Sequence, residues 1–467
     1  MKLKHLLFAF AFAILALADA VGQSDPEIVS WIINTTGTTG RHYVTGNSTP
    51  IDDTAQANVQ IVRYSDDYVY VNSTGIPSYI VGPYEDGNPI LATNNDWLWQ
   101  ISRNPVENTG TKTATRLGPI GVLINGVPIY DFQDGASYSS SAGEDDLRDG
   151  DGVWVRNAIL AENEGFDCAK GHPSPIFSGG GPGPGSGGTY HHHQNPTAFN
   201  LDKEEVSDVC DVYLADGLYT LDDSEHSPLI GYAFDGFPIY GGYGYANTDG
   251  TGGIKRMESS YQLRDITERT KLADGTDVTD GPDVSSDYPL GWYREDFEYK
   301  AGSGDLDEHN GRFCVTPEYP GGTYAYFATV DENWNSAYPY IVGPTFYGVV
   351  NQDNFTGMGG GNDVEIDEAV TRYEDPSTVV DILESADISV FPNPASDIII
   401  IQAEGLPRQD IQIRLFDMQG REVKTTILYE GSTISHIDAR TLYNGEYIIQ
   451  LSAGNQSVKE TVLINKE

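Results

Sequence analysis

Histidines gather in one short part of this 467-residue chain, in a pattern that suits a metal ion. Three are consecutive, His191, His192 and His193, and His172 stands upstream of them. Side chains two residues apart on an extended strand share one face, so His191 and His193 should point together, away from His192. Neutral imidazole is a frequent ligand of zinc, copper and nickel. The spacing therefore predicts a transition-metal site on one strand face.

Other residues are candidates for completing this site. His172 is the first candidate for a third ligand, because the glycine- and proline-rich segment 178–188 lets the chain double back. The remaining candidates are His192 on the opposite face, His226 and His309 beside acidic residues, and Asp235. Tyr190, Asp235 or a backbone carbonyl would fix the tautomer of each ring. The alternative is that the three consecutive histidines lie in a solvated glycine-rich loop.

Several segments return later in the chain, as duplicated hairpins would. Residues 120–130 return as residues 230–240, and each copy has an Asn-Gly or Asp-Gly dipeptide that predicts a type I′ turn between two strands. The sequence Tyr-Ile-Val-Gly-Pro starts at both Tyr79 and Tyr340. The offsets between copies are unequal, which excludes a regular solenoid. We expect a β domain with long loops inserted between duplicated hairpins.

One duplicated segment helps to separate scaffold from function. The residues Gly-Gly-Thr-Tyr precede His191 in one copy and Ala325 in the other. In the second copy both same-face positions are apolar, because Ala325 replaces His191 and Phe327 replaces His193. The scaffold therefore does not require imidazole at these positions. We interpret His191 and His193 as functional residues.

These segments resemble the YHYH-domain proteins, a secreted bacterial family named for a Tyr-His-Tyr-His motif. The motif falls on residues 190–193, with His192 where the family has tyrosine. A more specific match is the run Ser-Pro-Leu-Ile-Gly-Tyr-Ala-Phe-Asp-Gly-Phe-Pro-Ile-Tyr-Gly at residues 227–241, and residues 306–324 resemble the closing part of the domain. The resemblance covers most of residues 60–350. It places both same-face histidines on the family motif, but it implies no particular reaction.

The N-terminal residues predict export. Residues 1–20 combine Lys2 and Lys4 with an apolar stretch and a small-x-small ending at Ala20, which is typical of a signal peptide cleaved before Val21. Downstream aliphatic runs are far shorter than the roughly 20 residues of a membrane-spanning helix. We expect no transmembrane span in the mature chain.

The last eighty residues differ in character from the rest. Short alternating apolar runs, separated by turn residues, predict a small antiparallel sandwich at residues 388–467. Three motifs, at residues 391–394, 415–423 and 444–449, resemble the type A C-terminal sorting domain of the type IX secretion system. The resemblance implies export across an outer membrane through the type IX secretion machinery. A generic immunoglobulin-like stalk is the alternative.

Three cysteines in an exported chain allow one disulfide. We expect Cys168 to pair with Cys210, because this bridge closes the loop that holds the histidine-rich segment. A thiolate metal ligand is the alternative role for Cys168. Cys314 then stays free or becomes a ligand.

Composition and charge bound the fold and the partners. The formal net charge of −42 excludes nucleic-acid binding, because such a surface repels phosphate. The chain is rich in Tyr, Val, Ile and Thr, which predicts an all-β protein. Only residues 153–162 and 260–271 are weak helix candidates. The expected order is a signal peptide, a sandwich-like cargo domain with long loops at residues 21–356, a linker at 357–387 and the immunoglobulin-like sorting sandwich.

Three functional hypotheses follow for a protein that is secreted or held at the cell surface. The leading one is a metal-binding protein that holds copper in preference to zinc, with calcium as an additional ion at acidic turns. The second is a metalloenzyme, either a copper oxidase or a zinc hydrolase, that acts on an extracellular polymer. The third is a structural surface protein. The sequence leaves open whether any reaction occurs.

Overall fold

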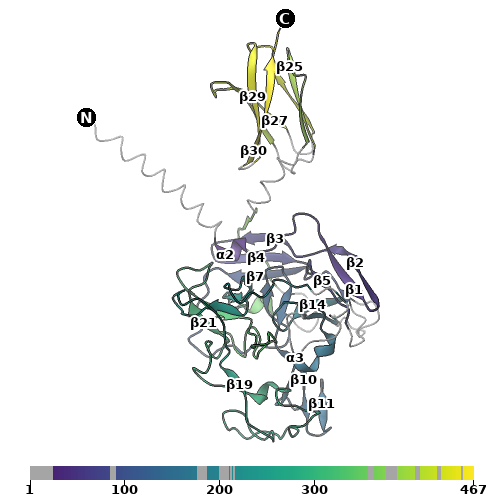
Figure 1. Ribbon diagram of the computed structural model, residues 1–467, viewed down its shortest axis with the longest axis vertical. Helices are drawn as coiled ribbons and strands as arrows, with labels where there is room; N and C mark the ends of the chain where they lie inside the picture. The colour runs from purple at the N-terminus through teal and green to yellow at the C-terminus, as the bar shows by residue number, and fades with distance from the viewer. Residues whose placement is uncertain are drawn as a thin grey trace, which may run out of the picture. The chain divides into compact units, whose positions relative to one another are not determined.

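The computed structural model consists of two compact units, a cargo unit (Met1–Tyr373) and a tail unit (Glu374–Glu467) (Figure 1). The described residues are 25–84, 91–175, 187–198, 210, 213, 216–355, 362, 364–374, 387–404, 411–428, 433–453 and 456–466. The predicted signal peptide lies outside these ranges. Strands dominate both units, which confirms the all-β prediction. Among the described residues, no helix is long and apolar enough to cross a membrane.

Among the described residues, the central sheet of the cargo unit has nine strands. Eight follow the order β13-β14-β9-β8-β15-β16-β22-β21, and β6 pairs with β14. The strands are β6 (Leu91–Ala92), β8 (Pro119–Leu123), β9 (Pro128–Tyr130), β13 (Gly171–Pro175), β14 (Gly187–His192), β15 (Leu229–Ala233), β16 (Pro238–Tyr240), β21 (Gly311–Cys314) and β22 (Thr323–Phe327). This order is symmetric about the β8·β15 pair. Hairpin β8–β9 corresponds to β15–β16, and hairpin β13–β14 corresponds to β21–β22.

The symmetric strand order explains the duplicated segments of the sequence. Strand β14 pairs in parallel with β9 through His192 and Ile129, and β22 pairs in parallel with β16 through Tyr326 and Ile239. The duplicated segments are therefore equivalent strands in two halves of one sheet. We call these halves the histidine half (β13, β14, β9, β8) and the second half (β15, β16, β22, β21).

The turns of the duplicated hairpins differ from the prediction. Gly126 and Gly236 have φ values of 81° and 87°, but Asn125 and Asp235 are not among the described residues with positive φ. A type I′ turn needs positive φ at both central residues, so that prediction was wrong. The Gly126 N–H donates to the Leu123 carbonyl at 2.7 Å, as in a type I turn followed by a left-handed glycine.

A second sheet packs against the central one. Its order is β23-β3-β4-β7, with β3 (Val59–Tyr64), β4 (Tyr68–Ser73), β7 (Trp97–Ser102) and β23 (Thr371–Arg372). Side chains alternate along β7, so Trp97 and Trp99 are fully buried whereas Leu98 is half-buried on the other face. The Trp99 ring lies 5.6 Å from that of Phe234 after β15, and both sheets contribute to one core, as expected of a sandwich-like domain. Strand β23 comes from the predicted linker, so part of that segment belongs to the cargo unit.

The other described elements of the cargo unit lie outside these two sheets. They are the strands β1 (Thr39–Val44), β2 (Asn47–Gln56), β5 (Ile80–Val81), β10 (Gln133–Ser139), β11 (Glu144–Asp146), β12 (Val155–Asn157), β17 (Tyr243–Tyr245), β18 (Ile254–Arg256), β19 (Tyr261–Leu263) and β20 (Phe297–Tyr299), the helices α2 (Pro26–Val29) and α3 (Ala158–Ala161), and the 3-10 turns η1 (Asn163–Gly165), η4 (Arg294–Asp296) and η5 (Gln352–Asn354). Of the helix predicted at residues 153–162, only the four residues of α3 are α-helical. The helix predicted at 260–271 was wrong, because β19 pairs there with β20.

The tail unit is a two-sheet sandwich, as predicted. One sheet has the order β24-β25-β28 and the other β27-β26-β29-β30. The strands are β24 (Asp387–Phe391), β25 (Ile398–Glu404), β26 (Ile411–Asp417), β27 (Glu422–Leu428), β28 (Ile434–Asp438), β29 (Gly445–Ala453) and β30 (Gln456–Ile464). Alternate residues such as Ile399, Ile413 and Leu451 form its separate core.

A disulfide joins Cys168 to Cys210 across a sequence separation of 42 residues, with 5.5 Å between their Cα atoms. Cys168 precedes β13, so the bridge lies close to the start of the histidine-bearing hairpin. Cys314, the last residue of β21, is buried and has a free thiol. Burial raises the pKa of this thiol, so it stays protonated at neutral pH.

Candidate metal centre

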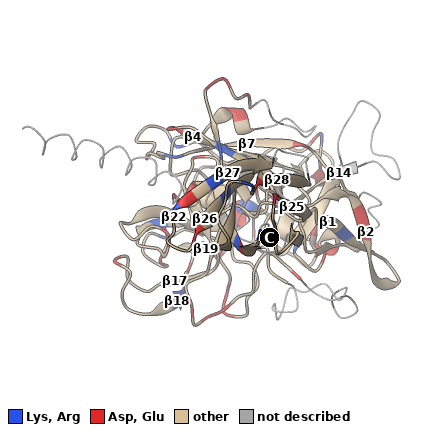
Figure 2. Ribbon diagram, turned by 90° about the horizontal axis from the view of Figure 1, so that it is seen from above, with Lys and Arg blue, Asp and Glu red and all other residues tan. Residues whose placement is uncertain are grey.

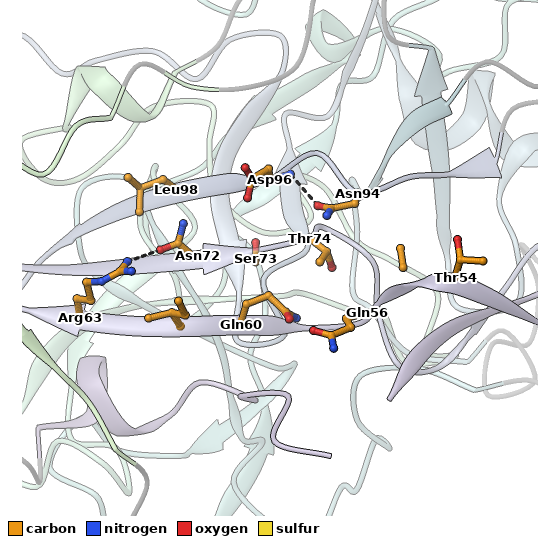
Figure 3. Close-up of a pocket in the computed structure, with 12 residues that line it drawn as sticks. Thr54, Gln56, Gln60, Arg63, Asn72, Ser73, Thr74, Asn94, Asp96 and Leu98 are labelled. Atoms are coloured by element: carbon orange, nitrogen blue, oxygen red, sulfur yellow. Dashed lines mark hydrogen bonds between the residues drawn. The ribbon is translucent and has the colours of Figure 1, made fainter. Parts of the chain in front are cut away.

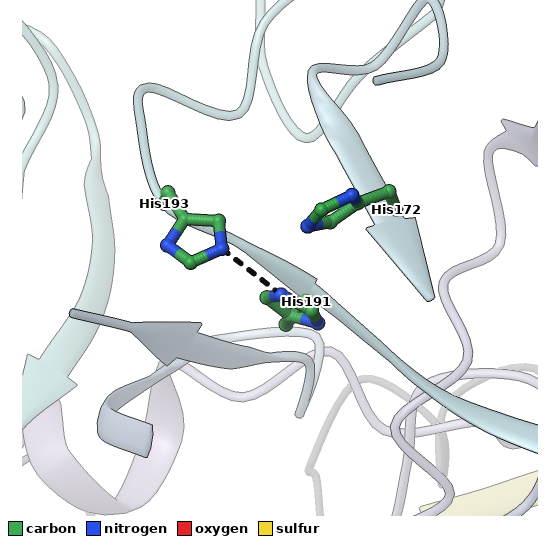
Figure 4. A group of neighbouring side chains, drawn as sticks. All are labelled: His172, His191 and His193. Carbon is green, nitrogen blue, oxygen red and sulfur yellow. Dashed lines mark hydrogen bonds between the residues drawn. The ribbon is translucent and has the colours of Figure 1, made fainter. Parts of the chain in front are cut away.

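The hairpin β13–β14 brings His172 and His191 together. The two strands are antiparallel, and His172 lies directly opposite His191 in their register. Directly opposite residues project from the same face of a sheet, and His193, two residues beyond His191, projects there as well. Imidazoles from β13, from β14 and from the residue that follows β14 thus meet at one place (Figure 4).

The three rings are close enough to share one ion. One ring nitrogen of each residue lies within 4.8 Å of those of the other two. His191 Nε2 and His193 Nε2 are 3.1 Å apart. Two nitrogens bound to one tetrahedral zinc at about 2.0–2.1 Å would lie roughly 3.3 Å apart. The observed separation therefore matches that of two ligands of one ion.

Backbone carbonyls determine which nitrogen of each ring faces the centre. His191 Nδ1 lies 2.9 Å from the carbonyl oxygen of Thr189, and His193 Nδ1 contacts the carbonyl oxygen of Asp131. A carbonyl only accepts, so each Nδ1 must carry the proton and donate it. In a neutral ring, Nε2 then carries no proton and offers a lone pair. Carbonyl partners of this kind are common behind metal-bound histidines.

Burial keeps these rings neutral. The three residues are at most 8% exposed, which excludes the solvated-loop alternative. Removal from water lowers the pKa of His193 to about 4 and holds the pKa values of His172 and His191 well below their ordinary value. Two neutral Nε2 lone pairs therefore face each other at 3.1 Å. A cation between them would turn this repulsion into attraction.

Two residues around the trio were not predicted from the sequence. Glu162, which follows α3, places Oε2 3.3 Å from His172 Nε2 and 3.5 Å from His193 Nε2. Tyr130, at the end of β9, stacks on His191 with 3.9 Å between ring centroids. No spacing rule points to Glu162, because its approach to the histidines depends on how α3 packs against the hairpin. The sequence feature that could have pointed to Tyr130 is its position at the end of the duplicated segment 120–130.

His192 lies on the opposite face, as predicted, but it does not join the trio. Its Nδ1 lies 3.1 Å from the carbonyl oxygen of Lys170, and its Nε2 lies 2.6 Å from the Tyr79 hydroxyl. Both ring nitrogens therefore have hydrogen-bond partners within the cargo core. Burial lowers the pKa of His192 to about 3, so the ring is neutral. This residue ties β14 to the segment around Tyr79.

The other three candidates lie elsewhere. His226 Nδ1 is 2.8 Å from the Ser227 carbonyl oxygen, and the ring packs against Tyr240 and other aromatic residues. His309 Nδ1 is 2.6 Å from the Thr345 hydroxyl. Asp235 accepts hydrogen bonds from the Tyr326 hydroxyl at 2.6 Å and the Gly348 N–H at 2.8 Å. None belongs to a described group that could hold a metal ion. The expectation that these residues join the histidine site was therefore wrong.

Comparison with known families agrees with the two units. The profile of the YHYH protein family matches residues 98–339, just over half of the chain. The chain belongs to the YHYH family. The matched region contains both halves of the central sheet and all three histidines of the candidate centre. In this YHYH protein the motif supplies two imidazoles to that centre, and strand β13 supplies the third.

The tail unit matches the secretion system C-terminal sorting domain over residues 389–465. The protein is therefore cargo of the type IX secretion system, exported to the cell surface or beyond it. No curated protein matches the chain. Among solved structures, dimeric latent PorU from Porphyromonas gingivalis is 16% identical, with a TM-score of 0.15. The match covers 18% of this chain and 9% of that protein, so the chain spans a small part of PorU.

Proposed function

We propose that this exported YHYH protein binds one transition-metal ion through His172, His191 and His193. The observation that carries the proposal is the pair of buried Nε2 atoms, 3.1 Å apart, whose rings are both oriented by backbone carbonyls. The ring nitrogens are already turned toward a common point, so little reorganisation accompanies binding. His172, opposite His191, adds the third nitrogen.

Glu162 supports the binding of a cation next to the imidazoles. Its Oε2 lies 3.3 Å from His172 Nε2 and 3.5 Å from His193 Nε2. The atoms that lie close enough together to share one ion are those of the three histidines, so Glu162 stands beside this set as a neighbouring negative charge. Catalytic zinc sites keep one position open for water or substrate, whereas structural and storage sites are closed by four protein donors. Three imidazoles leave the fourth position to water, so the proposal is one of metal binding and assigns no reaction.

The donor set indicates which ions to expect. Three imidazoles suit copper and zinc, whereas calcium takes six to eight oxygen ligands. At a site of this kind copper(II) binds more tightly than zinc, following the general order of divalent affinities. We therefore expect copper to displace zinc. One charge from Glu162 compensates part of the ion's charge in this buried place.

Metal analysis of the full chain, prepared without a histidine tag, tests the proposal. We expect about one copper or zinc ion per wild-type chain and none in a His191→Ala/His193→Ala variant, because a single imidazole and a carboxylate hold an ion weakly. A Glu162→Gln variant should keep the ion with an affinity lowered about tenfold. His226→Ala is the matched control and should bind like the wild type. Equal trace metal in the wild type and the double variant would refute the proposal.

A further inference from the structure

The outer face of the second sheet carries a groove that is separate from the histidine centre (Figure 3). Its cavity volume is about 450 Å³, within the range of small-molecule sites. The floor consists of Ile61 on β3, Asn72 on β4 and Leu98 on β7, which lie side by side in the sheet register. Residues of β2 and the segment before β7 form its walls. We call this feature the amide groove, because amide side chains dominate its polar lining.

Three amides of the groove are held in fixed orientations. Asn72 Oδ1 accepts a hydrogen bond from Arg63 Nη1 at 2.6 Å, which turns the Asn72 NH₂ group outward. Asn94 Oδ1 accepts from the Asp96 N–H at 2.9 Å, with the same effect on its NH₂ group. Gln60 Nε2 donates to two backbone carbonyls, at 2.9 and 3.1 Å, so its Oε1 remains as an acceptor. The groove thus presents two oriented donors and one oriented acceptor.

The charge of the groove is balanced although the chain is strongly acidic. Arg63 and Asp96 contribute one charge of each sign, and the other lining residues are uncharged. Elsewhere Asp and Glu positions are spread over many loops and strand ends (Figure 2). The net charge of −42 repels anionic ligands, and a balanced groove gives a cation no advantage over the surrounding surface. Neutral ligands rich in hydroxyl groups fit best, because hydroxyls both donate and accept.

We propose that the amide groove binds a short segment of a neutral oligosaccharide. Sugar hydroxyls would exchange hydrogen bonds with Asn72, Asn94 and Gln60. The apolar C–H faces of the sugar rings would lie on Ile61 and Leu98. Because the amides are already oriented, little side-chain entropy is lost on binding. This site is independent of the metal centre.

Calorimetric titration of the full chain with four neutral probes tests this proposal. The probes are cellohexaose, laminarihexaose, maltohexaose and N-acetylchitohexaose. We expect at least one to bind with a Kd between about 10 μM and 1 mM. An acidic galacturonate hexamer and an extended Ser/Thr-rich peptide should bind at least tenfold more weakly than that probe. Failure of all four neutral probes, or tighter binding of the peptide, would overturn the proposal.

Variants connect the binding to the groove. Asn72→Asp is nearly isosteric and keeps an acceptor for Arg63, but it loses both donor protons, so affinity should fall about tenfold. Asn94→Ala removes an exposed amide and should have a similar effect. The control Gln262→Ala, an exposed amide on β19, should bind like the wild type, and thermal melting verifies that each variant folds. Unchanged affinity in both groove variants would contradict the assignment. Binding should persist in His191→Ala/His193→Ala, which separates this site from the metal centre.

Discussion

The two halves of the central sheet share one framework but carry different side chains on it. In the histidine half the Tyr190 hydroxyl donates to Asp167, at 3.0 and 3.1 Å from its two carboxylate oxygens. In the second half the Tyr324 hydroxyl donates to Asp307 at 2.9 Å. In both, the aspartate begins a tight turn whose backbone bonds return to it four residues later. This tyrosine–aspartate turn is therefore scaffold, because both halves have it.

The difference lies on one strand face. Register places Arg312, Ala325 and Phe327 of the second half where the histidine half has His172, His191 and His193. The Arg312 guanidinium lies 5.6 Å from the centre of the Phe327 ring, so a permanent cation packs on an aromatic ring there. The same sheet positions thus hold a built-in cation in one half and three neutral imidazoles in the other. The comparison indicates that the histidines are not needed for the fold.

The largest effect is expected when the second half's cation is copied into the histidine half. His172→Arg removes one metal ligand and adds a positive charge beside the proposed ion. We expect metal affinity to fall at least about a thousandfold, beyond the 10–100-fold that loss of an outer partner produces. Competition with a chromogenic chelator measures this loss. Because an arginine already occupies the equivalent position of β21, the variant should fold.

Two observations keep that experiment interpretable. The far-ultraviolet circular dichroism of the variant should equal that of the wild type in the presence of EDTA. A His172→Gln variant, which lacks the added charge, should lose less affinity than His172→Arg. Retention of wild-type affinity by His172→Arg would show that the ion, if bound, does not use β13.

Strand periodicity made part of this site predictable. The two-residue period placed His191 and His193 on one face, and the apolar residues of the second copy marked them as replaceable. The position of His172 depended on the register of β13 with β14, which loop length does not determine. Glu162 gave no signal, because its approach depends on how α3 packs. His309 and Asp235 were misassigned because an acidic or histidine side chain in a motif can equally serve as a buried hydrogen-bond partner.

The fold, like the site, was predictable from the sequence only in part. Alternating apolar residues and the duplicated segments predicted strands, hairpins and the tail sandwich. The symmetric strand order could not be read from unequal offsets, because inserted loops hide it. The type I′ prediction failed since Asn-Gly and Asp-Gly also suit a left-handed glycine after a type I turn. Strand β23 was missed because an edge strand of two residues has no detectable period.

A second comparison concerns the hairpin turns, where Asp235 in one half corresponds to Asn125 in the other. Burial raises the pKa of Asp235 to about 6, whereas an unfolded aspartate titrates near 3.9. The native state therefore holds this proton more tightly than the unfolded chain does. The contribution of Asp235 to stability is greatest below about pH 4 and declines as the pH rises toward 6, by about 3 kcal/mol in total.

Asp235→Asn copies the other half and should remove this decline. Urea unfolding between pH 4 and pH 7 measures the free energy of unfolding of both proteins. The difference, variant minus wild type, should increase with pH between 4 and 6 and then level off, because an amide has no proton to release there. All other titrating groups are common to both proteins, so their contributions cancel in this difference. Parallel curves for the two proteins would rule out a raised pKa at Asp235.

The smallest expected effect is a loss of stability that tests whether His192 is structural, unlike its neighbours His191 and His193. Tyr326 occupies the equivalent position of β22, and both side chains end in buried hydrogen bonds. Tyr79→Phe removes the hydroxyl that lies 2.6 Å from His192 Nε2 and leaves a buried acceptor unsatisfied. We expect a loss of about 1–2 kcal/mol in the free energy of unfolding, with the metal content unchanged. Tyr68→Phe, which alters a half-buried tyrosine on β4, should change stability by less than about 0.5 kcal/mol. If Tyr79→Phe instead lowered the metal content, His192 would have to be counted with the trio, and the division of β14 into a binding face and a structural face would fail.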